Sequence, residues 1–171
     1  MIRIGNIVAT HGLQGGVILT HIIGHSDWLK KGAPLFVELN KESYIPYFTL
    51  QCKASNNAEY IVNLEDIEKV EQAKRLVGKH VYVQEEILEE KAADSPLLWI
   101  GFEVTDRKHG KLGKIADIMQ TPTQWLAQVN YKDAEVLIPL IEQTIDGIDL
   151  KKKKIEVNLP DGLLEVYLNH G

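Results

Sequence analysis

Short apolar runs separated by turn residues fill the first half of the chain, and this pattern constrains the fold more than any other feature. Several runs alternate with period two, as Tyr60, Val62 and Leu64 do, and this spacing is typical of half-buried strands. The runs cover residues 2–9, 17–23, 35–39, 44–53, 59–64 and 80–84. Six short strands in one compact stretch predict a small β-barrel.

Two helical segments interrupt the strands of this first half. Residues 68–77 place Val70, Ala73 and Leu76 on one face, and Gly78 follows as a C-terminal stop, so we expect a helix that plugs one end of the barrel. Ser26 is suited to cap a short helical turn that ends near Gly32. The remaining connections are turns and loops.

The same strand pattern returns after residue 96. Apolar runs lie at residues 97–105, 111–119, 125–131, 136–141 and 155–159, with turns at 107–110, 122 and 132–133, and residues 162–168 close the chain. This pattern predicts a second small β domain. The fold class expected for the whole chain is therefore mainly all-β, with two small β-barrels.

An acidic stretch separates the two halves. Residues 84–96, Q-E-E-I-L-E-E-K-A-A-D-S-P, hold few large apolar side chains and end in a proline. We interpret them as an interdomain linker, and a short surface helix over residues 85–93 fits them equally well. The expected division is a first domain at 1–84, a linker at 85–96 and a second domain at 97–171.

Composition excludes several classes of function. With 44% hydrophobic residues, the chain can fold around real cores without disulfides, and its single Cys52 cannot form an internal bridge. A net charge of −5 argues against a protein that coats RNA or DNA, so nucleic-acid contact would have to be local. The N-terminus lacks the pattern of a secretion signal, and charged residues or prolines interrupt every apolar run. We therefore expect a cytoplasmic protein with no membrane role.

The sequence offers no catalytic constellation, cofactor motif or metal-ligand spacing. His21 and His25 are four residues apart, but a zinc site needs further ligands and only Asp27 is near them in the sequence. Cys52 belongs to an alternating strand without a neighbouring histidine, which favours a buried and inert thiol. We expect no catalytic residue, no bound metal and no cofactor.

Residues 10–16, T-H-G-L-Q-G-G, form the most unusual local sequence of the chain. Three glycines in five residues allow a sharp turn and a close approach of the backbone, but they match no phosphate-binding pattern. A glycine-dependent loop between two strands is the simpler interpretation. It is compatible with a second one, in which the loop presents His11 and Leu13 to a partner.

Two further segments are candidates for contact. Residues 136–141, V-L-I-P-L-I, carry Pro139 where a central strand would need an N–H, which predicts an edge strand or a bulge beside an exposed groove. The four lysines at 151–154 are able to meet a phosphate backbone. Because Asp149 and Glu156 flank them, a solvated hairpin tip is the more typical interpretation.

Three blocks of sequence resemble the RimM family, the ribosome maturation factors of bacteria. They are I-G-N-I-V-A-T-H-G-L-Q-G-G-V at 4–17, A-K-R-L-V-G-K-H-V-Y-V at 73–83, and G-F-E-V-T-D with G-K-L-G-K-I-A-D-I within 101–118, extended by the closing V-L-I-P and L-P-D-G-L-L-E segments. The resemblance covers nearly the whole chain, and the order and spacing of the blocks make it specific. It implies a six-stranded barrel like those of translation factors, followed by a PRC-barrel.

The resemblance also implies a function. It points to a monomeric assembly factor without catalysis that binds the immature 30S small ribosomal subunit and the head ribosomal protein of the S19 family. Local contact with 16S rRNA would accompany this binding and assist rRNA processing. The residues we expect at partner interfaces are His11, Gly12, Leu13, Gly15, Trp99, Leu137, Ile138, Pro139, Gly162, Leu163 and Leu164.

The chain departs from the family pattern in two places. The family usually has Leu-Lys-Gly-Glu where this chain has Leu13-Gln14-Gly15-Gly16, so a lysine expected to face rRNA is missing. The family also has a pair of aromatic residues before the PRC-barrel, and here Trp99 is the nearest aromatic side chain. We expect Trp99 to take over part of that apolar contact.

Two other functions compete with assembly. An RNA-processing enzyme would need a buried acid–base pair or a metal site, and the sequence indicates neither. A PRC-barrel scaffold for a non-ribosomal partner is the other alternative, because small β-barrels serve many functions. The blocks in the first half argue against the scaffold.

Overall fold

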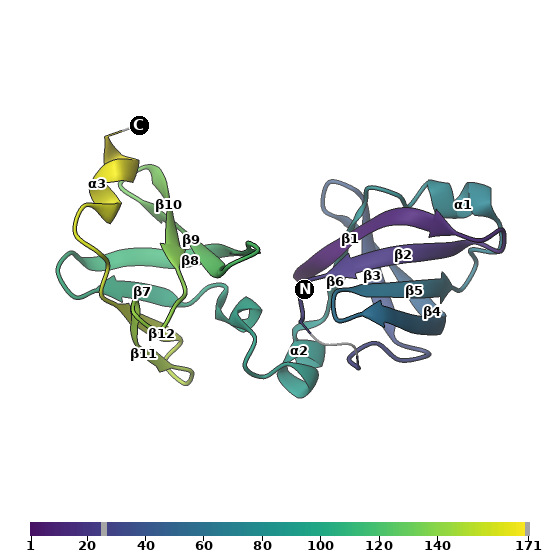
Figure 1. The fold of residues 1–171 in the computed structure, drawn as a ribbon, viewed down its shortest axis with the longest axis horizontal. Coiled ribbons are helices and arrows are strands. Elements are labelled where there is room, and N and C mark those ends of the chain that lie inside the picture. The colour runs from purple at the N-terminus through teal and green to yellow at the C-terminus, as the bar shows by residue number, and fades with distance from the viewer. Residues whose placement is uncertain (25–26, 170–171) are drawn as a thin grey trace. The chain divides into compact units, whose positions relative to one another are not determined.

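The computed structural model describes residues 1–24 and 27–169, and strands form most of its regular structure (Figure 1). The chain divides into two compact units, Met1–Ser95 and Pro96–Gly171. The mainly β fold expected from the alternating runs is confirmed. The helical turn expected to begin at Ser26 starts outside the described residues.

Six antiparallel strands close the first unit into a barrel, in the order β1-β2-β5-β4-β3-β6. The strands are β1 Ile2–His11, β2 Gly16–His21, β3 Pro34–Asn40, β4 Ser43–Asn56, β5 Glu59–Leu64 and β6 His80–Val83. They match the six predicted runs. Because β1 pairs with both β2 and β6, the ring of hydrogen bonds is complete.

The barrel interior is filled by the side chains that alternate inward along these strands. On β5, Tyr60, Val62 and Leu64 are buried, while the residues between them are partly exposed. Trp28 packs edge-on against the Tyr60 ring, with 5.6 Å between the ring centroids. The period-two pattern of the sequence therefore corresponds directly to the core.

The predicted helix over residues 68–77 is shorter than expected. Helix α1 spans Val70–Lys74, buries Ala73 and contacts β1 and β2. Beyond it, Leu76 and Val77 donate backbone hydrogen bonds to residues three positions earlier, so the last turn is tighter than an α-helix. The Gly78 N–H donates to the Ile7 carbonyl and so ties this segment to β1.

The first part of the acidic stretch is helical, as the second of its two interpretations expects. Helix α2 spans Glu85–Lys91, and its Leu88 is fully buried while Glu85 and Glu86 lie in its first turn. Acidic residues at a helix N-terminus are favourable because they oppose the helix dipole. The compact unit that contains α2 extends to Ser95.

The second unit is a six-stranded sheet in the order β10-β9-β8-β7-β12-β11. Its strands are β7 Glu103–Asp106, β8 Gly110–Gln120, β9 Trp125–Tyr131, β10 Ala134–Pro139, β11 Ile145–Asp149 and β12 Lys154–Val157. The pair β7 and β12 is parallel, and the other pairs are antiparallel. Helix α3, Leu163–Leu168, follows the last strand.

The structure of this unit differs in two places from what the sequence predicts. The run at 97–105 is a strand only from Glu103, because Pro96–Trp99 forms a 3₁₀ helix, η1, and Gly101 turns the chain with a φ of 88°. Strand β11 was not predicted. Its residues are mostly exposed, and such an edge strand lacks the buried alternation that would identify it.

Candidate protein-docking surface

Strand β10 forms one edge of the second sheet and pairs only with β9. Val136 and Ile138 point into the core and are buried, whereas Leu137 and Pro139 are half-buried on the opposite side. The edge position expected from the proline is confirmed. Since Pro139 has no N–H, it also limits how far another strand could extend pairing along this edge.

Helix α3 packs beside β10. The Tyr167 hydroxyl donates a hydrogen bond of 3.4 Å to the Leu137 carbonyl, and Leu164 is buried beneath the helix. Val166 is 57% exposed on the outer side. We call Leu137, Pro139, Leu163, Val166 and Tyr167 the β10–α3 surface. Its partly exposed apolar side chains, with Val166 the most exposed, suit contact with another protein better than chemistry.

A buried carboxylate positions α3. Asp106 is almost fully buried at the end of β7, and its Oδ1 accepts a 2.9 Å hydrogen bond from the Leu159 N–H. Its Oδ2 accepts from the backbone N–H groups of Lys108 and His109, at 3.1 and 2.9 Å, and from His109 Nδ1 at 2.7 Å. Asp106 therefore joins the β7–β8 turn to the segment that leads into α3.

Polar and charged side chains near the surface add to this connection. Lys108 pairs with Asp161, just before α3, and His109 Nε2 lies 4.0 Å from Glu165 within α3. Burial acts to raise the pKa of Asp106, but the hydrogen bonds from Leu159 and His109 outweigh it and leave this pKa below its usual value. Asp106 is thus held as a carboxylate, which is the form that accepts all four hydrogen bonds.

The glycine loop lies in the first unit, between β1 and β2. Leu13 is 84% exposed at its tip, and His11 and Gly12 are also exposed. Gly15 is buried with a φ of 76°, and a Cβ there would lie 2.2 Å from the Ile67 carbonyl oxygen. The packing of Gly15 supports the simpler interpretation of the loop, and the exposure of Leu13 leaves the second one a prediction.

The predicted interface residues fall into three groups in the structure. The β1–β2 loop belongs to the first unit, whereas Trp99 is half-buried in η1 of the second unit. The segments 137–139 and 162–164 are brought together by the contact of α3 with β10. Ile138 and Leu164 lie in the core, 1% and 2% exposed, so we assign them to packing rather than to direct contact.

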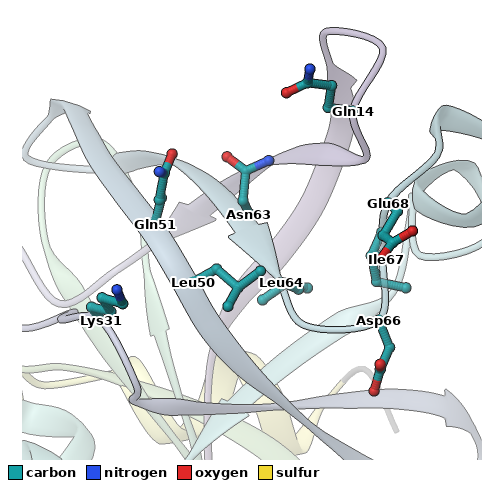
Figure 2. A pocket seen from close by; sticks show the side chains of 9 residues that line it. All are labelled: Gln14, Lys31, Leu50, Gln51, Asn63, Leu64, Asp66, Ile67 and Glu68. Atoms are coloured by element: carbon teal, nitrogen blue, oxygen red, sulfur yellow. The ribbon is translucent and has the colours of Figure 1, made fainter.

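Sequence reasoning missed a groove on the outside of the barrel, which we call the β4–β5 groove. It consists of two adjoining depressions of 610 and 860 Å³ that share Lys31, Leu50, Gln51 and Asn63. Figure 2 shows Gln51 and Asn63 extending from β4 and β5 on the side where Gln14 projects from the β1–β2 loop. Its residues come from four distant segments, so no local sequence pattern could reveal it.

The side chains considered for metal binding and for nucleophilic chemistry, His21 and Cys52, both make contacts typical of a structural role. His21 packs against the rings of Trp28 and Tyr60 inside the barrel, and His25 lies outside the described residues. The Cys52 thiol donates to the Leu29 carbonyl, and burial raises its pKa. Within residues 1–24 and 27–169, the structure holds no group of three or more histidine, cysteine or carboxylate side chains arranged for a metal.

Family models cover both units of the chain. The model of the RimM N-terminal domain matches residues 2–88, and that of the RimM PRC barrel domain matches residues 99–163. The chain belongs to the RimM family. The closed barrel lies within the part of the chain that matches the RimM N-terminal domain. The six-stranded sheet lies within the part that matches the RimM PRC barrel domain, which ends at the first residue of α3.

Relatives match over nearly their full length. A protein named ribosome maturation factor RimM from Parabacteroides distasonis is 29% identical over 96% of this chain and 95% of its own. Its namesake in Flavobacterium psychrophilum is 30% identical, with the same coverage. A Pseudomonas aeruginosa crystal structure titled as a 16S ribosomal RNA processing protein RimM has a TM-score of 0.45 and 19% identity, and covers 93% of this chain and 97% of its own.

Proposed function

We propose that this chain is a ribosome maturation factor that works by binding and not by catalysis. It would bind the immature 30S subunit, dock on the head ribosomal protein of the S19 family, touch 16S rRNA locally, and so assist head assembly and rRNA processing. The observation that carries this proposal is the match to RimM proteins over both units. The β10–α3 surface supports docking on a protein.

Charge also favours a protein as the main partner. The chain has a net charge of −5, which repels RNA in general but attracts the basic surfaces of ribosomal proteins. Assembly of this kind takes place in the cytoplasm, where we place the chain as a monomer. Among the described residues, no helix is both long enough and apolar enough to cross a membrane.

Co-sedimentation with purified small subunits tests the proposal. The protein should pellet with immature subunits more than with mature ones, and its binding should weaken only slightly as salt rises, because few phosphate contacts are involved. If the protein pelleted with neither kind of subunit, the proposed ribosomal function would be contradicted, and a scaffold for another partner would be the remaining interpretation. Turnover of precursor rRNA by the purified protein would instead indicate an enzyme.

Paired variants locate the contact within the second unit. Val166→Glu puts a charge on the β10–α3 surface, while Leu150→Glu makes the same kind of change at a residue that is 63% exposed in the β11–β12 turn. We expect Val166→Glu to weaken binding to the purified head ribosomal protein at least about tenfold, because a charge would be desolvated in the interface. Leu150→Glu should bind normally, and equal losses would count against the surface.

Trp99 provides an independent check. Its half-buried ring lies in η1, so replacement by alanine should leave the fold intact and weaken subunit binding. Unchanged binding of Trp99→Ala would discard a role for this ring.

A further inference from the structure

The outer face of β4 exposes apolar side chains to solvent. Phe48 and Leu50 are 44% and 41% exposed, and Thr49 between them is buried because neighbouring residues of a strand point to opposite sides. Leu50 lies in both depressions of the β4–β5 groove, whereas Phe48, two residues earlier on β4, is exposed beside them and lines neither. An exposed aromatic ring beside a groove can support a flat ligand.

Lysines flank this face in the first unit. Lys31 and Lys53 are exposed, and neither has an ion-pair partner within residues 1–24 and 27–169. Lys31 is held beside β4 because the Gly32 N–H donates to the Thr49 carbonyl at 2.7 Å. Lys30 also lines the groove, and its charge contributes to lowering the pKa of Glu90 in α2, whose ion-pair partner is Lys91.

Two amide side chains complete the groove between the lysines and the β1–β2 loop. Gln51 and Asn63 are paired across β4 and β5, and neither side chain hydrogen-bonds to another described residue. Each amide can donate and accept, which suits the edges of nucleobases. The far end of the groove is acidic, with Asp66 and Glu68, so a polyanion would bind at the lysine end.

We propose that the β4–β5 groove binds a short single-stranded RNA segment, with a base on Phe48, base edges at Gln51 and Asn63, and phosphates at Lys31 and Lys53. Aromatic platforms combined with cationic grooves are the usual way in which proteins hold single strands. Taking this RNA to be 16S rRNA rests on the function proposed above. The groove would then supply the rRNA contact that the loop, lacking its lysine, does not.

Fluorescence anisotropy with a labelled single-stranded RNA of about 12 nucleotides tests this site. The full-length protein is titrated between roughly 50 and 200 mM salt. The double variant Lys31→Glu/Lys53→Glu is compared with Lys41→Glu/Lys74→Glu, which changes charge equally at exposed lysines outside the groove. Phe48→Ser is compared with Val8→Ser, because Val8 is similarly exposed, at 46%, on β1.

We expect the groove double variant to bind at least about tenfold more weakly, and its slope of log K against log salt to be shallower by about 1.4. Phe48→Ser should weaken binding about fivefold or more with an unchanged slope, because stacking is not ionic. Both control variants should stay within about twofold of the parent. Equal thermal unfolding of all variants would show that the barrel is intact.

Three results would overturn the site. The first is no RNA binding by the parent at the lowest salt, and the second is an equal loss of RNA binding in the groove variants and the control variants. The third is that the groove variants bind RNA normally but bind the head ribosomal protein more weakly, which would indicate that the groove holds a protein. Co-sedimentation of the parent with immature subunits separates the two proposals. If the parent pellets and the groove variants bind RNA normally, only the groove proposal fails, whereas absence of pelleting contradicts the ribosomal function itself.

Discussion

The two units of this protein differ in whether their sheets have free edges. The first closes six strands into a ring, so its backbone hydrogen bonds are used internally. The second leaves β10 and β11 at the edges of its sheet, and Pro139, the Tyr167 hydrogen bond and the shortness of β11 protect them. The closed barrel can therefore offer only side chains and loops to a partner, while the open sheet offers an edge as well.

The source of stability differs in the same way. The first unit depends on its alternating apolar core, whereas the second also depends on one buried carboxylate that connects distant segments. Asp106 is the only carboxylate that is buried among residues 1–24 and 27–169. The second unit should therefore be more sensitive than the barrel to polar substitutions and to acid, because Glu38, a carboxylate of the barrel whose pKa is also lowered by hydrogen bonds, is only partly buried.

Asp106→Ala should have the largest effect. It removes four hydrogen bonds and leaves the buried Leu159 N–H without an acceptor, which should destabilise the second unit by about 3–5 kcal/mol. Urea unfolding followed through single-tryptophan versions can separate the units, since Trp28 reports on the first and Trp125 on the second. If both units lost the same free energy of unfolding, Asp106 would not be a specific source of stability for the second unit.

Gly15→Ala should destabilise the first unit and leave the second unchanged, the reverse of Asp106→Ala. The new Cβ would collide with the Ile67 carbonyl, and the positive φ disfavours any other residue, so we expect a loss of about 2–3 kcal/mol in the barrel alone. Gly12→Ala is the matched control, because Gly12 also has a positive φ but its Cβ would meet nothing within 4 Å. It should cost about 1 kcal/mol.

Mild acid should give the smallest effect. Because the pKa of Asp106 is lower in the folded state than in the unfolded chain, its contribution is present above about pH 4 and is lost as pH falls through the folded value. Unfolding at pH 5 and at pH 3 should therefore show the second unit losing up to about 1 kcal/mol more than the first. Asp106→Asn should remove this difference.

Much of the fold could be predicted because inward side chains alternate along each strand. Tyr60, Val62 and Leu64 are one example, and Pro139 correctly indicated an edge. Strand β11 was missed because an exposed edge carries no apolar alternation. The extent of α1 was overestimated because its apolar spacing continues into turns that are not α-helical.

The candidate sites were less accessible to sequence reasoning. A local pattern could mark the exposed Leu13 and the segment around Leu137, since each lies in one short stretch. It could not tell that Ile138 faces the core, because this depends on the register with β9. The β4–β5 groove needed the closed barrel to bring Lys31, Lys53 and Asn63 to one face.

The parallel pairing of β7 with β12 has a consequence for synthesis on the ribosome. Val104 pairs with Ile155, so β7 emerges about fifty residues before the strand that covers it. At a translation rate of roughly 5–20 residues per second, β12 is synthesised on the order of 3–10 s after β7. Nascent chains of this protein thus pass through an interval in which the barrel can already be folded while a strand of the second unit is open to association with other chains.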